Sequence, residues 1–285
     1  MMILAMLAFM TNDMLVKLAS FTLPLGQILT IRSLLALGFL LVFVDGTHLY
    51  RIDKRLLVSK AFLARHAGEA GASFFYLSAL FLIPIANAAS IMQIVPLSVT
   101  AAGALFLKES VGWRRWLAII LGLVGVLLVI QPGLAGFNLA SLMVILAVGF
   151  VTLRDIASRV LPVTISSLIV TFFTSIFMLA FGLILGLFES WTLPDAETWA
   201  YLCLSSLSIL AGFYGVTEAM RHGETAVVAP FRYTAIIWAT LYGLFIFNDT
   251  MNGLTIVGIA FIIAAGLYSL RRRKLAALSK PPILG

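Results

Sequence analysis

The sequence is poor in charge and almost free of cysteine. Asp, Glu, Lys and Arg make up 11% of its 285 residues, whereas an ordinary soluble domain carries about 25%. So few charged side chains cannot cover the water-facing surface of a large soluble core, and 62% of the residues are hydrophobic. The single cysteine, Cys203, lies in an apolar run and excludes an internal disulfide. These deficits indicate an all-α integral membrane protein.

Motifs for catalysis, metal binding and ATP hydrolysis are missing from the sequence as well. No Cys/His cluster has the spacing of metal ligands, and no glycine-rich phosphate loop is present. The three histidines, His48, His66 and His222, stand in no nucleophile motif. We therefore expect no catalytic residue, no metal and no cofactor, and a membrane-embedded enzyme is the least favoured class of function.

Long hydrophobic runs are what the sequence has in abundance. A helix needs about 20 mostly apolar residues to cross a bilayer. Ten such segments fit, at residues 2–19, 26–44, 61–82, 85–107, 113–131, 138–158, 163–188, 197–219, 225–247 and 252–270. Short connections with turn-forming residues separate them, and no linker or soluble domain is visible.

The distribution of basic residues predicts how the segments are oriented. Fifteen of the 19 Lys and Arg residues lie in or beside alternate loops, whereas the other loops hold none and carry Glu189, Asp195 and Asp249. Because basic loops stay in the cytoplasm, we expect a multi-pass protein of the inner membrane with both termini cytoplasmic. The net charge of +7 is then a topology signal and not a nucleic-acid site. The expected partners are the lipid bilayer and a small-molecule substrate; the oligomeric state stays open, a monomer included.

The two halves of the chain show a weak internal repeat. A shift of 140 residues aligns Thr100 with Thr240, and a shift of 142 near the start of each half aligns Asp13 with Asp155. Five segments in each half force opposite orientations, and such inverted repeats are typical of secondary transporters with a substrate site near the midplane. The expected units are five-helix repeats at 1–133 and 134–272, followed by a cytoplasmic basic tail at 273–285.

Two similar charge pairs lie inside the first and sixth segments. Asp13 and Lys17 are four residues apart with the acid first, as are Asp155 and Arg159, which is the spacing of an ion pair on one helix. Each pair could neutralise itself at a helix end, or it could form a gate contact to another helix. Because inverted repeats place the two pairs at opposite faces of the membrane, we favour helix-end or gate features over a shared substrate site.

A substrate cavity is predicted between the third, fourth, eighth and ninth segments. Charge at the bilayer centre costs roughly 2.5–3.5 kcal/mol on insertion scales, so buried charges face the bundle interior or a water-filled cavity. Arg232 could hold a carboxylate with two parallel hydrogen bonds, or it could pair with Glu218 or Glu224 and fix helix packing. Tyr233 and Trp238 could supply an aromatic wall. The candidate cavity residues are Glu69, Tyr76, Asn87, Gln93, Tyr214, Glu218, Arg232, Tyr233 and Trp238.

Several scattered positions give the chain a resemblance to a known family. They are Pro24, Arg32, Pro96, Glu109, Trp116, Gly122 and Gly125 in the first half, and Asp249, Gly258 and Gly266 in the second. With the ten-segment layout, the whole chain resembles the drug/metabolite transporter superfamily, in particular proteins with two EamA-type domains. The resemblance implies export of small metabolites across the bacterial inner membrane, and the likeness is greatest to exporters of amino acids, aromatic ones included.

The residues by themselves predict less than the resemblance does. They indicate a small-solute transporter that alternates access between its two halves. The alternatives are an exporter or uniporter of another small solute, such as a drug, a nucleoside or an amine, and a passive facilitator on the same fold.

Overall fold

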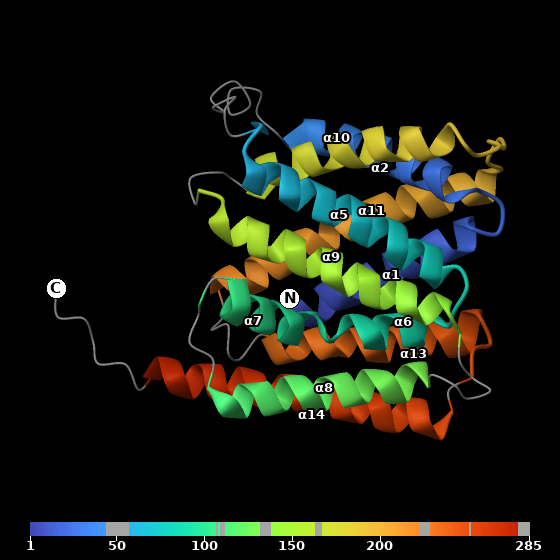
Figure 1. Ribbon diagram of the computed structural model, residues 1–285. Coiled ribbons are helices and arrows are strands. Elements are labelled where there is room, and N and C mark those ends of the chain that lie inside the picture. The colour runs from blue at the N-terminus through green and yellow to red at the C-terminus, as the bar shows by residue number, and fades with distance from the viewer. Residues whose placement is uncertain are drawn as a thin grey trace.

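The computed structural model describes residues 1–43, 57–106, 108, 112–131, 138–162, 167–222, 229–250 and 252–278. These residues form a bundle of helices joined by turns, and no strand occurs among them (Figure 1). The elements are α1 (Met2–Ala19), α2 (Leu25–Phe43), α5 (Lys60–Leu80), α6 (Ile85–Met92), α7 (Val95–Phe106), α8 (Trp113–Ile130), α9 (Ala140–Val160), α10 (Ser167–Gly186), α11 (Ala196–His222), the 3-10 helix η1 (Ala229–Tyr233), α13 (Thr234–Ile246) and α14 (Gly253–Leu278).

Each of the ten expected segments contains an α-helix, with turns at some segment ends and at residues 93–94. Five of them are long and apolar enough to cross a membrane, namely Met2–Ala19, Ile85–Phe106, Ala140–Val160, Ile169–Gly186 and Ala196–Val216. Large apolar side chains cover the outside of the bundle, among them Leu34, Leu127 and Phe245 at 60%, 54% and 80% exposure. A soluble protein rarely exposes so much apolar surface, so the exterior confirms a membrane environment.

Several segment ends differ from the prediction or lie outside the described residues. The expected starts of the seventh and ninth segments, at residues 163–166 and 225–228, are not described, and neither are residues 44 and 107 at the ends of the second and fourth. Helix α14 runs on to Leu278, through the first part of the predicted basic tail. Arg, Lys, Leu and Ala dominate that stretch, and all four are strong helix formers, so the helix continues after the apolar segment has ended.

The bundle has two chemically different ends. At one, named the basic end, α2, α7, α9 and α14 finish (Figure 1, left). Exposed Lys108, Arg114 and Arg271 lie there. The opposite end, named the acidic end, holds the turns that join α1 to α2, α10 to α11 and α13 to α14. These turns carry Glu189, Asp195 and Asp249.

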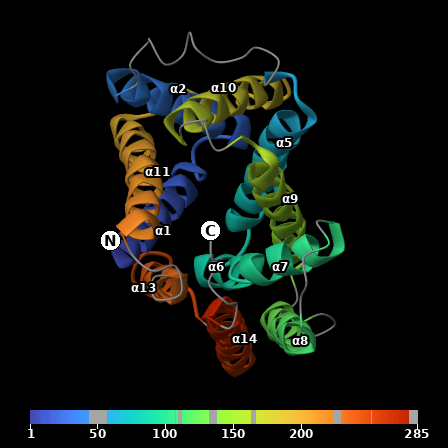
Figure 2. The ribbon, with the colours of Figure 1, turned by 90° about the vertical axis from the view of Figure 1, so that its left-hand side faces the viewer.

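Helices pair across the two halves of the chain. α1 lies along α11, α5 along α9, α2 along α10 and α8 along α14 (Figure 2). Glycines allow close approach: a Cβ added at Gly125 would lie 2.7 Å from the carbonyl oxygen of Gly258, and one at Gly258 would lie 2.6 Å from that of Gly125. Small residues at such contacts let helix backbones pack tightly in membranes. Each half of the chain therefore relies on the other for its main helix contacts.

The fourth and ninth segments are both broken inside the bundle. α6 ends at Met92 and α7 begins at Val95, so Pro96 stands in a first helical turn, where its missing N–H removes no helical bond. In the ninth segment the short 3-10 helix η1 precedes α13. Irregular backbone at membrane depth is tolerated where protein buries it or where it lines a water-filled cavity.

Asp195 caps α11 at the acidic end. Its carboxylate accepts bonds from the Thr198 side chain and from the Thr198 backbone N–H, the latter at 2.8 Å, and these bonds lower the pKa of this exposed group from its ordinary 3.8. Such a carboxylate stabilises the fold at pH values above the pKa that it has in the unfolded chain. This contribution to stability is lost as the pH falls through the lower pKa that it has in the folded protein. We expect Asp195→Ala to lower the thermal unfolding midpoint in detergent at pH 7. The difference from wild type should shrink below about pH 4.

The control for this prediction is Asp195→Asn, which keeps an oxygen that can cap the helix. It should lie closer to wild type at pH 7 than the alanine variant does. An alanine effect that is equally large at pH 3 and pH 7 would contradict an ionised cap.

Candidate functional site

A buried charge cluster joins α5 to α9. Arg154 donates through Nη1 to Glu69 Oε2 at 3.0 Å, and its Nη2 lies 2.9 Å from Asp155 Oδ1. The side chains of Arg154 and Glu69 are 25% and 17% exposed. The helices come close because Gly68 faces the backbone of Arg154, where an added Cβ would lie 2.8 Å from its nitrogen. One guanidinium thus serves two carboxylates, one from each helix.

Three polar side chains of α5 contact three different neighbouring helices. Arg65 Nη1 donates to Thr174 Oγ1 of α10 at 2.7 Å, and Glu69 binds Arg154 of α9. Tyr76 donates its hydroxyl to Asp13 Oδ2 of α1 at 2.6 Å. α5 is therefore fixed on three sides by polar contacts, and its polar side chains hold the interior in a defined arrangement.

A second polar network surrounds Asp13 near the middle of the bundle. Asn12 Nδ2 donates to Asp13 Oδ1 at 2.9 Å, and Arg32 Nη1 donates to Asn12 Oδ1 at 3.3 Å. Asn12, Asp13 and Arg32 are all buried. Arg32 also lies close enough to interact electrostatically with both Asp13 and Glu69. Charges of alternating sign therefore run from Asp13 through Arg32 to the charge cluster.

Arg232 lies at the break of the ninth segment. Gln93, at the break of the fourth, donates through Nε2 to the backbone carbonyl of Arg232 at 3.3 Å. The Arg232 side chain is exposed and lies within electrostatic reach of Asp155. Among the described residues it joins no ion pair, since both pairs there belong to Arg154. The predicted partner Glu224 lies outside the described residues. The structure thus brings Gln93, Arg232 and Asp155 toward one another.

Lys17 holds a turn at the acidic end. Its Nζ donates to the carbonyl of Ile83 at 2.5 Å and lies 5.0 Å from the ring centroid of Phe247. From the other side, Asp249 Oδ2 accepts the backbone N–H of Ile85 at 3.3 Å. The turn between α5 and α6 is therefore clamped by a cation from α1 and an acid from the turn before α14. We name this arrangement the acidic-end clamp.

The predicted pair of Asp13 and Lys17 is replaced by contacts with other parts of the chain. Asp13 accepts from Tyr76 of α5 and from its neighbour Asn12, and Lys17 donates to the carbonyl of Ile83. Asp155 binds Arg154, the residue before it on α9. An i,i+4 ion pair on a helix contributes only about 0.2–0.5 kcal/mol. A hydrogen bond to a charged group contributes about 1.5–3 kcal/mol, so a partner on a neighbouring helix or turn prevails.

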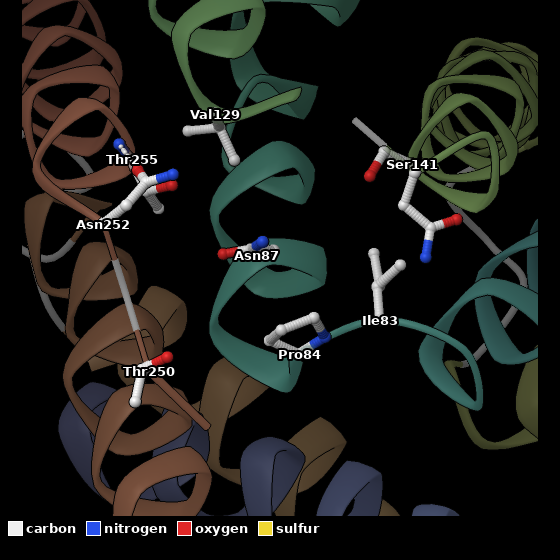
Figure 3. A pocket seen from close by; sticks show the side chains of 9 residues that line it. Ile83, Pro84, Asn87, Val129, Ser141, Thr250, Asn252 and Thr255 are labelled. Carbon is white, nitrogen blue, oxygen red and sulfur yellow. Dashed lines mark hydrogen bonds between the residues drawn. The ribbon is translucent and has the colours of Figure 1, made fainter. Parts of the chain in front are cut away.

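A neutral polar pocket of about 480 Å³ lies at the acidic end (Figure 3). Asn87 of α6 faces it, with Ser141 of α9 and Thr255 of α14 around its edge. Beside it, Gln131 and Asn252 exchange amide hydrogen bonds of 2.8 and 3.0 Å. The pocket lies at the start of α6, whereas Gln93 follows the last residue of that helix. Asn87 is therefore separated from the candidates near Arg232.

The aromatic candidates lie in packed positions and do not form an open wall. Tyr233 is 6% exposed, and its hydroxyl fills the notch at Gly266, where an added Cβ would clash with it. Trp238 packs against the core, and neither its indole N–H nor the Tyr233 hydroxyl has a described hydrogen-bond partner. Tyr214 is 65% exposed on α11, and Glu218 on the same helix is half-buried.

Two residues important to the network were not among the predicted site residues. Arg154 resembles an ordinary topology charge because it stands close to the basic end of its segment. Arg32 did carry a signal, since it lies in an apolar segment with no acid at helical spacing. A lone buried arginine of this kind requires a partner from another helix, but the sequence does not identify that helix.

The outside of the bundle is apolar, and charged side chains contact one another between its helices. This arrangement defines a polytopic membrane protein with a polar interior. Residues 1–131 and 138–271 each match the sequence profile of the EamA-like transporter family. The chain belongs to this family, within the drug/metabolite transporter superfamily, and carries two EamA domains. The resemblance seen in the sequence is thereby confirmed.

Characterised relatives transport different small metabolites. The S-adenosylmethionine uptake transporter of Rickettsia prowazekii is 25% identical over 70% of this chain and 68% of its own. The riboflavin transporter of Vibrio cholerae is 25% identical over 64% and 61%. The pseudopaline exporter of Pseudomonas aeruginosa is 25% identical over 95% of both chains. A solved crystal structure shares the fold, with a TM-score of 0.59 at 19% identity over 93% of this chain and 97% of the other.

Proposed function

We propose that the chain is a secondary transporter that exports small metabolites, with amino acids as the substrate class, across the inner membrane by alternating access. The observation that carries this proposal is the exposed guanidinium of Arg232 at a helix break, within electrostatic reach of Asp155. A guanidinium can bind a substrate carboxylate through two parallel hydrogen bonds. A carboxylate nearby can bind a substrate ammonium group. An amino acid carries both groups.

The pairing of helices supports a mechanism based on two inverted repeats at 1–133 and 134–272. If the two halves exchanged places, the α1–α11 pair would become the α9–α5 pair, while α2–α10 and α8–α14 would map onto themselves. The two broken segments would exchange in the same way. Such a design allows the halves to rock around a site at their interface.

The proposed orientation places the basic end in the cytoplasm, as the excess of Lys and Arg favours. Arg232 then lies on the cytoplasmic side, where an exported substrate binds first, and the acidic-end clamp closes the path to the outside. Export, as opposed to uptake, is supported by the pseudopaline exporter, which aligns over 95% of both chains, whereas the S-adenosylmethionine uptake transporter aligns over 70% of this one.

The test is a competition panel in proteoliposomes. Purified protein, reconstituted with a labelled amino acid, is challenged with unlabelled amino acids, nucleosides and amines, with and without a pH gradient. We expect amino acids to compete, and substrate on the opposite side to accelerate exchange. Flux that shows no such acceleration would indicate a passive facilitator. Competition by nucleosides or amines alone would overturn the substrate class.

A proton-coupled mechanism would depend on one of three carboxylates, Asp13, Glu69 and Glu218. Glu69 is already bound by Arg154, whereas the side chain of Asp13 accepts its hydrogen bonds from the neutral donors Tyr76 and Asn12. If a pH gradient stimulates export, we expect Asp13→Asn to abolish that stimulation while basal exchange persists. The measurement compares the flux at equal pH on both sides of the membrane with the flux under a pH gradient of either direction. Stimulation that survives in Asp13→Asn, Glu69→Gln and Glu218→Gln would exclude all three carboxylates.

A further inference from the structure

An apolar groove runs along the outside of the bundle between α13 and α14. α13 packs against α1 and α6, whereas α14 packs along α8. The helices α13 and α14 lie side by side but pack against different parts of the bundle (Figure 2). The groove encloses about 590 Å³. Its lining comprises Phe231, Tyr233, Thr234, Ile236, Ile237, Thr240, Leu241, Ile256, Ile259, Ile263 and Leu267.

The groove faces the lipid part of the bilayer. Ile237, Ile256 and Leu267 are 57%, 55% and 40% exposed, which in a membrane means contact with hydrocarbon. From Ile256 to Leu267, α14 extends about 16 Å along the groove, at a rise of about 1.5 Å per residue. That distance is about half of the roughly 30 Å hydrocarbon core. An acyl chain from one leaflet therefore matches the groove in both polarity and length.

Helical register places positive charge where the groove reaches the basic end. On α14 the lining residues Ile256, Ile259, Ile263 and Leu267 recur at spacings of three and four and so share one face. The same spacing continues to positions 271 and 274, which are Arg271 and Lys274, and α14 is helical to Leu278. Arg272 and Arg273 fall on other faces of the helix. An apolar stripe therefore continues directly into two cationic positions.

A polar group is also present at the basic end of the groove. Tyr233 lines the groove and packs against Gly266, next to Leu267. Its buried hydroxyl has no hydrogen-bond partner among the described residues. Gly266 covers this hydroxyl, so Tyr233 contributes to the groove through its ring.

We propose that the α13–α14 groove is a binding site for an anionic phospholipid, whose acyl chain fills the groove and whose phosphate lies at the cationic helix positions 271 and 274. Basic positions at the edge of a transmembrane helix attract anionic headgroups, and the groove adds shape to that charge. Phe231 and Tyr233 belong to η1, which also carries Arg232. The bound lipid thus contacts the broken segment directly.

Native mass spectrometry of the full chain, titrated with phosphatidylglycerol or phosphatidylcholine, tests the site independently of transport. We expect the wild type to retain phosphatidylglycerol preferentially. The double variant Arg271→Gln with Lys274→Gln should weaken that binding about 30-fold. Each basic residue near an anionic membrane surface contributes a similar part of the binding free energy, and this factor corresponds to the loss of two of them. The matched control, Arg272→Gln with Arg273→Gln, removes the same charge from other faces and should bind almost as wild type does. Equal losses in both double variants would overturn the proposal.

A second pair of variants tests the groove itself. Ile259→Trp fills it, whereas Ile120→Trp adds the same ring at a lipid-exposed position of α8 outside the groove. We expect only Ile259→Trp to release the retained lipid, with both variants eluting as folded protein. Retention of phosphatidylglycerol by Ile259→Trp would overturn the acyl-chain assignment. Dimers that dissociate in Ile259→Trp would instead assign the groove to a second copy of the chain.

Discussion

Replacing Arg154 with alanine is expected to abolish most of the folded protein. Arg154 is the partner of both Glu69 and Asp155, and Glu69 is 17% exposed. Removing one partner of a buried ion pair costs about 3–5 kcal/mol, because the other charge is left uncompensated. A typical fold has about 5–15 kcal/mol in total. The measurement is the yield of monodisperse protein in detergent, together with its thermal unfolding midpoint.

The control separates charge from packing. Arg154→Gln combined with Glu69→Gln removes both buried charges and leaves two amides that can hydrogen-bond, so this double variant should be clearly more stable than Arg154→Ala. Arg114→Ala, at an exposed position of the basic end, should change the midpoint little. A double variant as unstable as Arg154→Ala would show that the cluster acts through shape and not through charge balance.

Replacing Arg232 with alanine is expected to leave the fold intact and to weaken transport of carboxylate-bearing substrates. The side chain is exposed and has no ion-pair partner among the residues that the structure describes. A hydrogen bond to a charged group contributes about 1.5–3 kcal/mol, which corresponds to a loss of roughly 10–150-fold. Initial rates in proteoliposomes, measured over a range of substrate concentrations, give this factor.

The conservative variant sharpens the test. Arg232→Lys keeps the charge but loses the planar fork that binds a carboxylate through two hydrogen bonds, so it should fall between wild type and Arg232→Ala. An amine analogue without a carboxylate should be transported equally by all three proteins. Loss of folded Arg232→Ala protein from detergent extracts would instead assign Arg232 to helix packing.

The helical layout was predictable because the membrane restricts what an apolar chain can do. A segment in hydrocarbon must satisfy its backbone internally, so long apolar runs such as 2–19 and 138–158 became α1 and α9 with small shifts at their ends. The break before Pro96 was also foreseeable, since proline interrupts a helix. The 3-10 helix η1 was not predicted, although Pro230 within it is the same kind of signal as Pro96.

The candidate site was less predictable because its contacts join helices that are far apart in the sequence. Tyr76 binds Asp13 from 63 residues away, and Arg154 binds Glu69 from 85. Sequence spacing identifies pairs along one helix but not pairs between helices, so Asp13 and Lys17 were matched with each other. The internal repeat aligned Gln93 with Tyr233, whereas the structure places Gln93 against the backbone carbonyl of Arg232, one residue earlier.

The pairing of α1 with α11 has a consequence for how the chain enters the membrane. Phe9 of α1 packs against Phe213 of α11, with ring centroids 5.3 Å apart. The ribosome adds these roughly 200 intervening residues at about 5–20 per second, so α1 is made about 10–40 s before its partner. The polar partners of α1 are made earlier, because Tyr76 binds Asp13 and the carbonyl of Ile83 binds Lys17. The two charges of α1 can therefore be satisfied once the third segment has arrived, whereas the apolar face of α1 waits for the eighth.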